Sequence, residues 1–188
     1  MNKITNIQIK DCDNPKFVQT KRMHYTQNGI SKQWEIVLNY DSVSILLVDE
    51  QRNIFIIVKQ FRPAVFLQNN DGVTYEICAG IVDKDLPLIE IAREEALEEC
   101  GYNIPLENIK VENELYSGVG FSGSKQTFYI AHINEDMKVS DGGGIDDEVL
   151  EVFHIDIDKS KDFLSDDSIV KTPGLAYAIT KYLYDKGI

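Results

Sequence analysis

Residues 80–102 read GIVDKDLPLIEIAREEALEECGY, a short loop followed by a run of strong helix formers. The run from Leu88 to Cys100 predicts a helix, because Pro87 suits a first helical turn and Gly101 supplies a left-handed stop. Several glutamates fall inside this helix. In an arbitrary acidic run, such residues form a solvated face, and that is the default interpretation.

The helical wheel argues against a solvated face for part of this run. At about 100° per residue, Glu95 and Glu99 fall among the apolar positions, whereas a solvated face would separate acids from the apolar stripe. Burying carboxylates without compensation is costly. Glu98 lies within one turn of both. We therefore expect these three glutamates to bind Mg²⁺ or Mn²⁺ through hard oxygen ligands, and we expect Glu90 and Glu94 to be solvated.

From Gly80 onward the residues resemble the signature of the Nudix hydrolases, G-x5-E-x7-R-E-U-x-E-E-x-G-U with U apolar, and the spacing fits without a gap. The resemblance implies that Glu95, Glu98 and Glu99 hold the metals that bridge a pyrophosphate, with Glu98 also counted as catalytic. It further implies that the backbone carbonyl of Ala79 completes the coordination shell.

Two positions depart from this signature. Leu86 stands where the first glutamate belongs, and Glu94 stands where the arginine belongs, with Arg93 one residue too early. The first departure removes an auxiliary carboxylate and the second removes a cation, while the metal triad stays intact. They keep open an alternative in which the chain is a Nudix-like module that senses a nucleotide sugar without hydrolysing it.

Segments outside the signature are similar to the ADP-ribose and nucleotide-sugar branch of the family. They include KQFRPAVF at 59–66, YEICAG at 75–80, YSGVGFSGSKQTFYIA at 116–131 and the glycine-rich acidic stretch from 142. Within that branch the closest group is the UDP-sugar (UDP-glucose) pyrophosphatases. The implied reaction is hydrolysis of the pyrophosphate of a nucleoside diphosphate sugar, UDP-glucose-like or ADP-ribose, to a nucleoside monophosphate and a sugar phosphate.

Three candidate substrate-binding residues lie near the first of these segments. Arg62 is suited to clamp a phosphate, because guanidinium binds phosphate oxygens bidentately; the alternative is a surface ion pair. Gln60 is a candidate to hydrogen-bond substrate, or it is a solvated strand end. The family implies that Glu76 helps with metal or ribose, and the alternative is a structural hydrogen bond.

Two further candidates lie elsewhere in the chain. Gly118 belongs to a glycine-rich loop that lets backbone approach a substrate closely, or that is simply flexible. Trp34, with Tyr25, is a candidate to stack on the base, although a lone tryptophan in a strand more often belongs to the core.

The proton-abstracting group is expected in a late loop. In the related ADP-ribose enzymes the general base lies there, and Asp146-Asp147-Glu148 is the matching place. Glu148 is the expected base because it directly precedes the VLEV strand, with Asp147 second. Three adjacent acids in a glycine-rich loop are otherwise an ordinary soluble loop.

The order of strands and helices along the 188 residues predicts an α/β fold, a Nudix α/β/α sandwich with a mixed sheet. Residues 41–188 would form the Nudix hydrolase domain. Residues 1–40 would form an N-terminal antiparallel β element that turns at Asn28-Gly29. The resemblance implies a homodimer that exchanges this element.

The formal net charge of −12 argues against a nucleic-acid partner. The sequence lacks an apolar run long enough for a membrane span, and its N-terminus lacks the apolar core of a signal peptide, so we expect a cytoplasmic protein without a membrane partner. The three cysteines fit reduced thiols. A third interpretation, an acidic interaction protein, would leave Glu95 and Glu99 within the apolar stripe unexplained.

Overall fold

The computed structural model describes residues 4–145 and 148–188 of the chain. Its main sheet has seven strands in the order β5-β4-β3-β8-β7, with β6 paired to β3 and β9 paired to β4. β3 and β8 pair in parallel and the other pairings are antiparallel, so the sheet is mixed, as predicted. The strands are β3 (Ser42–Asp49), β4 (Ile54–Phe61), β5 (Val73–Glu76), β6 (Cys78–Ile81), β7 (Ile109–Ser117), β8 (Ser124–His132) and β9 (Leu150–Asp156).

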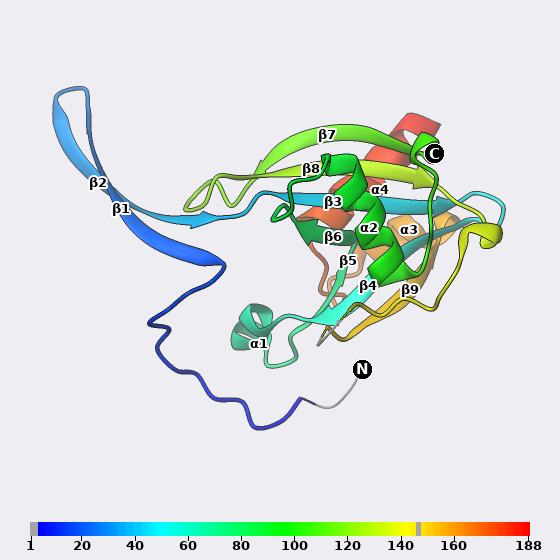
Figure 1. Cartoon of the computed structure of the whole chain (residues 1–188), viewed down its shortest axis with the longest axis horizontal. Helices are drawn as coiled ribbons and strands as arrows, with labels where there is room; N and C mark the ends of the chain where they lie inside the picture. Colours follow the sequence, from blue (N-terminus) through cyan, green and yellow to red (C-terminus); the bar gives the residue numbers. More distant parts are fainter. Residues whose placement is uncertain (1–3, 146–147) are drawn as a thin grey trace.

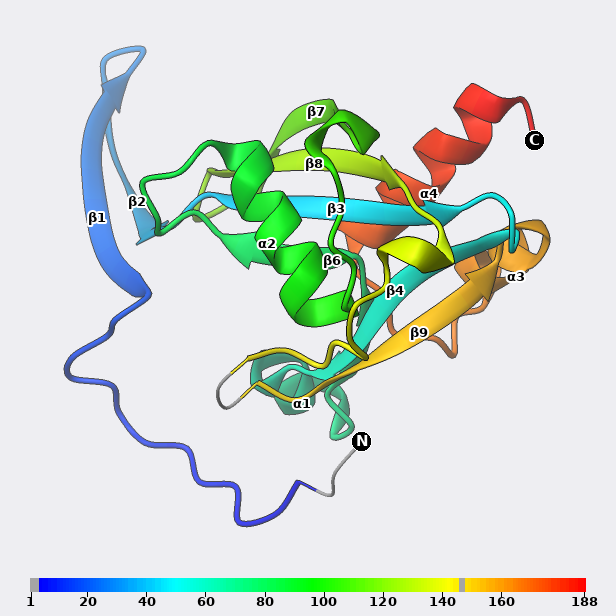
Figure 2. The same cartoon turned by 45° about the vertical axis from the view of Figure 1, so that its right-hand side comes forward.

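Helices cover both faces of this sheet. α2 (Leu88–Cys100) lies on one face, and α4 (Pro173–Lys186) lies on the other, so the predicted α/β/α sandwich is confirmed (Figure 2). The shorter helices are α1 (Pro63–Asn69), α3 (Ser160–Ser165) and the 3-10 turns η1 (Leu106–Asn108), η2 (Glu135–Met137) and η3 (Ile157–Lys159). Among the described residues, no helix is long and apolar enough to cross a membrane.

The core consists of two layers because the central strands bury both of their faces. Along β3, Val43, Ile45 and Leu47 pack in the layer under α2. Leu46 and Val48 point the other way and pack in the layer under α4. Successive side chains of a strand alternate between faces, so a strand that is buried on both faces fits between two helical layers.

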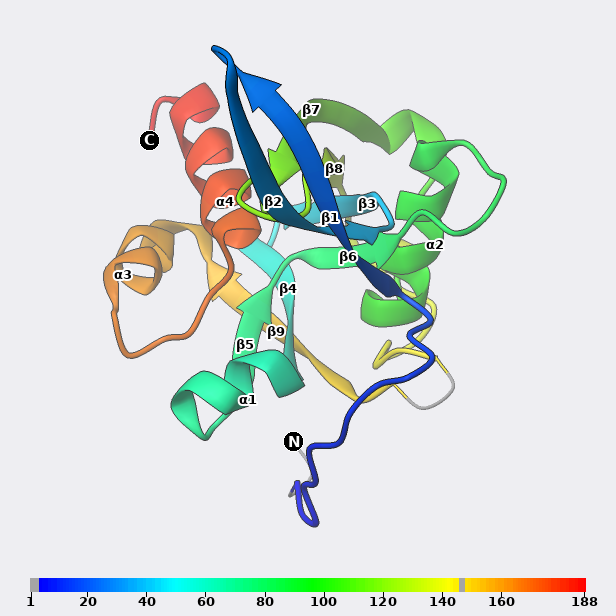
Figure 3. The ribbon, with the colours of Figure 1, turned by 90° about the vertical axis from the view of Figure 1, so that its left-hand side faces the viewer.

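The N-terminal element forms a sheet of its own. β1 (Val18–Gln27) and β2 (Ile30–Asn39) pair antiparallel and extend away from the main sheet (Figure 1), so that the hairpin lies in front of the sheet in Figure 3. Asn28 and Gly29 join them with φ angles of 54° and 78°, which is the geometry of a tight hairpin turn. The Val37 N–H donates to the Phe121 carbonyl at 2.7 Å, so the loop before β8 holds the base of the hairpin.

Candidate active site

The glutamates singled out in the sequence lie on the side of α2 that faces the sheet. Glu99 is only 5% exposed, whereas Glu95 and Glu98 are half-buried. The expectation from the helical wheel is therefore confirmed for Glu99 and in part for Glu95. The expectation that Glu90 and Glu94 are simply solvated was wrong, because both are half-buried in ion pairs, with Arg93 at 2.9 Å and Lys84 at 2.7 Å respectively.

The environment of Glu99 disfavours its charged form. Burial raises the pKa of Glu99 to about 8, and the negative charge of Glu95 adds to the effect. Two donors oppose this rise: the Cys78 thiol and the Ala79 N–H, which donates to Oε2 at 3.1 Å. Burial and the charge of Glu98 raise the pKa of Glu95 to about 7. A cation at this place would relieve both carboxylates.

Gly80 allows the end of β6 to approach Glu95. A Cβ added at Gly80 would lie 1.9 Å from Oε1 of Glu95, far closer than any real contact. Any larger residue would therefore push the carboxylate away from the strand. This gives a physical reason for glycine at the first signature position.

The late loop is fastened to the C-terminal end of α2. Gly143 N–H donates to the Glu99 carbonyl at 2.9 Å, and Gly144 N–H donates to the Glu98 carbonyl at 3.1 Å. These bonds satisfy helix carbonyls that would otherwise be unpaired. They also bring Glu148 close enough for its charge to raise the pKa of both Glu95 and Glu99. The second candidate base, Asp147, lies outside the described residues.

A cleft of about 690 Å³ gathers three of the predicted residues, Gln60, Arg62 and Glu148. The charges of Arg62 and Glu148 both act on Glu99, which links the cleft to the α2 glutamates. The wall of the cleft is half polar and half apolar, and the apolar part includes Phe61 and Phe66, whose ring centroids lie 5.8 Å apart. The sequence analysis missed these two aromatic residues. The available signal was the position of phenylalanines on both sides of Arg62 in the KQFRPAVF segment.

Arg62 is held by Glu76 in a two-pronged ion pair. Nε lies 2.8 Å from Oε1 and Nη2 lies 2.9 Å from Oε2, while Thr74 donates its hydroxyl to Oε1 at 2.5 Å. Glu76 raises the pKa of Arg62, with a smaller contribution from Glu99. Glu76 thus makes the hydrogen bonds of the structural alternative, while its predicted help with metal or ribose stays a prediction. In the described hydrogen bonds, Glu76 contacts Nε and Nη2 of Arg62 and does not contact Nη1, so the Nη1 amino group can donate to a ligand.

Trp34 and Gly118 do not line this cleft. Trp34 lies on the hairpin and is 55% exposed, so the core interpretation of this residue was wrong. Its Nε1–H donates to the Gly120 carbonyl at 2.8 Å, which places the indole against the loop that contains Gly118. Within one chain, these two candidates lie together but apart from Glu148 and Arg62.

The residues around α2 fit a hard divalent cation. Glu95 and Glu99 offer carboxylate oxygens whose charged form is disfavoured until a cation is near. The neighbouring bases pair with other acids, Arg62 with Glu76 and Lys84 with Glu94. Within residues 4–145 and 148–188, no three His, Cys, Asp or Glu side chains already converge as a closed site. Small side-chain rotations would therefore accompany metal binding.

Comparison with known proteins agrees with this geometry, although no family model matches the chain. The bovine uridine diphosphate glucose pyrophosphatase NUDT14 is 33% identical over 96% of this chain and 94% of its own length, and the mouse protein is 32% identical over the same shares. The chain belongs to the Nudix hydrolase family. A GDP-mannose pyrophosphatase of Klebsiella pneumoniae is 31% identical to this Nudix hydrolase over 79% of the chain and 73% of its own length.

The raised pKa values of Glu95 and Glu99 predict how the stability of this Nudix hydrolase changes with pH when no metal is bound. The folded state keeps protons on Glu95 and Glu99 up to about pH 7 and 8, while an unfolded chain releases them near the ordinary value of 4.5. The stabilisation that these bound protons give the folded state is therefore complete below about pH 4.5 and is lost as pH rises. Counting Glu99 alone, because Glu95 is partly exposed, we expect a loss on the order of 3 kcal/mol between pH 5.5 and 8.5, or roughly 6–12 °C in Tm.

Thermal unfolding in EDTA between pH 5.5 and 8.5 measures this loss. Added Mn²⁺ or Mg²⁺ should raise Tm more at pH 8.5 than at pH 5.5, because metal takes the place of the protons. Glu99→Gln should flatten the pH dependence of the metal-free protein. A wild-type Tm that stays level or rises over this range would contradict the assignment of buried protonated carboxyls.

Proposed function

We propose that this Nudix hydrolase splits the pyrophosphate of a nucleoside diphosphate sugar, UDP-glucose-like or ADP-ribose, to a nucleoside monophosphate and a sugar phosphate. The observation that carries the proposal is the position of Glu95, Glu98 and Glu99 on one turn of α2, beside a cleft that contains Arg62 and Glu148. The names of the relatives, which refer to UDP-glucose and GDP-mannose, support a nucleotide-sugar substrate.

The proposed roles follow from where each side chain lies. Glu95, Glu98, Glu99 and the Ala79 carbonyl would hold Mg²⁺ or Mn²⁺, which when bound neutralises charge on the bridging phosphates and activates water. Arg62 would donate from Nη1 to a phosphate oxygen, with its guanidinium held in place by Glu76. Gln60 would hydrogen-bond substrate from the cleft wall.

The reaction needs one water and one proton acceptor. The water oxygen attacks a phosphorus atom, the bond from that phosphorus to the bridging oxygen breaks, and the departing phosphate keeps the electron pair. Glu148 would accept the proton of the attacking water, because it lines the cleft and lies near the glutamate cluster. The apolar wall of Phe61 and Phe66 would exclude bulk water from one end of the substrate.

A substrate panel tests this function. UDP-glucose, ADP-ribose, GDP-mannose and ADP-glucose are incubated with Mg²⁺ or Mn²⁺ in the presence of a phosphatase. The phosphatase releases inorganic phosphate from the two monophosphate products and not from the intact substrates. We expect phosphate release that depends on metal and differs among the four substrates. No release from any of them would overturn the proposal.

Leu86 and Glu94 favour a second candidate, a nucleotide-sugar sensor that does not hydrolyse its ligand. This candidate predicts that a panel member raises Tm while phosphate release stays at background. Hydrolysis is the better supported function, because Glu95, Glu98 and Glu99 are all present beside the cleft.

The proposal includes a homodimer in which residues 1–40 of each chain contact the partner. One face of the hairpin carries Met23, Ile30, Trp34 and Leu38, all at least 48% exposed, and an apolar face of this size favours a covering partner. Trp34 would then reach a base in the partner's site. A monomeric mass by light scattering at micromolar concentration would contradict this part. We also propose a cytoplasmic location, which the free thiols of Cys78 and Cys100 support.

A further inference from the structure

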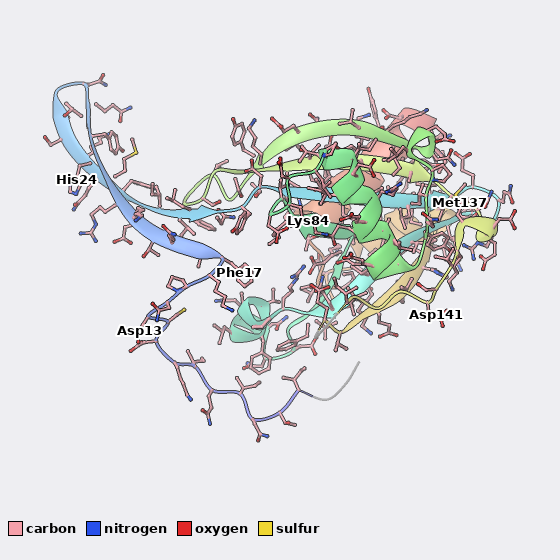
Figure 4. All side chains as sticks on the ribbon, viewed as in Figure 1. Asp13, Phe17, His24, Lys84, Met137 and Asp141 are labelled. Atoms are coloured by element: carbon pink, nitrogen blue, oxygen red, sulfur yellow. The ribbon has the colours of Figure 1, made fainter. Side chains whose placement is uncertain are left out.

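Lys84 connects the loop before α2 to the helix itself. Its Nζ lies 2.7 Å from Oε2 of Glu94, and the two side chains are 43% and 34% exposed. The side chain projects from the loop that enters α2 (Figure 4). Residues 83–87 of this loop are exposed, and a hydrogen bond from Val82 N–H to the Asp41 carbonyl at 2.9 Å fixes its start. The Lys84 contact therefore holds the middle of an otherwise exposed loop.

This ion pair has the opposite polarity to the signature. The signature has an acid in the loop and a base on the helix, whereas this chain has Lys84 in the loop, Leu86 at the acidic position and Glu94 at the basic position. Both departures thus belong to one rearrangement of charge. Loss of the acid at position 86 and of the base at position 94 would by itself abolish the attraction between loop and helix. A base at 84 and an acid at 94 would restore it.

We propose that the Lys84–Glu94 pair is a positioning device that holds the loop between β6 and α2 and thereby aligns Glu95 with the Ala79 carbonyl for a divalent cation. The inference rests on the metal site of the proposed function. Ala79 and Gly80 lie on β6 immediately before the loop, and Glu95 directly follows Glu94. Movement of the loop would therefore change the distance between the two sides of the site.

The charge of Lys84 also reaches the cluster itself. Its ammonium is stabilised by Glu94 first, and then by Glu98 and Glu95. Removing Lys84 alone would thus alter both alignment and local charge, so a single variant is ambiguous. The double variant Lys84→Met with Glu94→Gln keeps the net charge and removes the attraction. The exchange variant Lys84→Glu with Glu94→Lys keeps both the net charge and the attraction.

The experiment measures Mn²⁺ binding to the metal-free protein by electron paramagnetic resonance, without substrate. Because exposed ion pairs contribute little, we expect the neutral double variant to weaken Mn²⁺ binding by about 2–5-fold. The charge-exchange variant and Lys84→Arg should each keep most of the wild-type affinity for Mn²⁺. The Mg²⁺ concentration for half-maximal phosphate release should shift in parallel, with the maximal rate less affected.

A matched control removes another exposed ion pair of the same length. Lys125 lies 2.7 Å from Glu114 on the neighbouring strands β7 and β8, and the double variant Lys125→Met with Glu114→Gln should bind Mn²⁺ like wild type. If the neutral Lys84 and Glu94 variant also binds like wild type, the positioning role is wrong while the metal site stands. If wild type itself binds no Mn²⁺, both this inference and the proposed metal site are overturned.

Discussion

Replacing Glu99 by Gln is expected to lower kcat by about 10³-fold with saturating Mg²⁺, which corresponds to roughly 4 kcal/mol of lost transition-state stabilisation. Glutamine keeps the shape of the side chain and can still accept the Ala79 N–H through its amide oxygen. It cannot supply the negative charge that a hard divalent cation requires. Glu99 is the most buried of the three glutamates, so water has little access to take over its place as a ligand.

Glu90→Gln is the matched control for this prediction. Glu90 lies on the same helix, and its carboxylate pairs with Arg93 at 2.9 Å. We expect near wild-type turnover from this variant. The Tm of the metal-free Glu99→Gln protein must also be measured, because a variant that stays folded yet loses activity and Mn²⁺ binding isolates the ligand role. Near wild-type turnover of Glu99→Gln would show that the metal assignment is wrong.

Secondary-structure elements whose signals are local could be predicted from the sequence. The helix over residues 88–100 has the predicted bounds, because strong helix formers lie between Pro87 and the left-handed Gly101. Residues 73–78, VTYEIC, form by contrast one continuous strand-like run in the sequence. The structure divides this region at Ile77, since β5 pairs with β4 while β6 pairs with β3. That change of partner depends on the whole sheet and leaves no local pattern.

The same distinction holds for the site. The burial of Glu99 could be predicted from helical spacing, which is local. The pairing of Arg62 with Glu76 could not, because it depends on the register in which β4 and β5 lie side by side. The exposure of Trp34 is also a tertiary property, because the hairpin extends beyond the main sheet and leaves Trp34 55% exposed.

Replacing Glu148 by Gln is expected to lower kcat by about 10²–10³-fold while Mn²⁺ binding changes little, because a general base contributes to the rate and not to metal affinity. Glu148 lines the cleft together with Gln60 and Arg62, and the hydrogen bonds of Gly143 and Gly144 tie its loop to the end of α2. Glutamine cannot accept a proton from the attacking water. The rate and the Mn²⁺ affinity of the variant, measured side by side, separate loss of the base from loss of a metal ligand.

Two comparisons decide whether Glu148 is the base. Asp141→Asn changes an acid of the same loop that is paired with Lys138 at 3.4 Å, and it should leave both the rate and Mn²⁺ binding unchanged. Asp147→Asn tests the alternative base. If that variant loses about 10²–10³-fold in kcat and Glu148→Gln does not, the base is Asp147. If Glu148→Gln instead weakens Mn²⁺ binding as strongly as Glu99→Gln does, Glu148 is a metal ligand, because only loss of a coordinating oxygen lowers the rate and the affinity together.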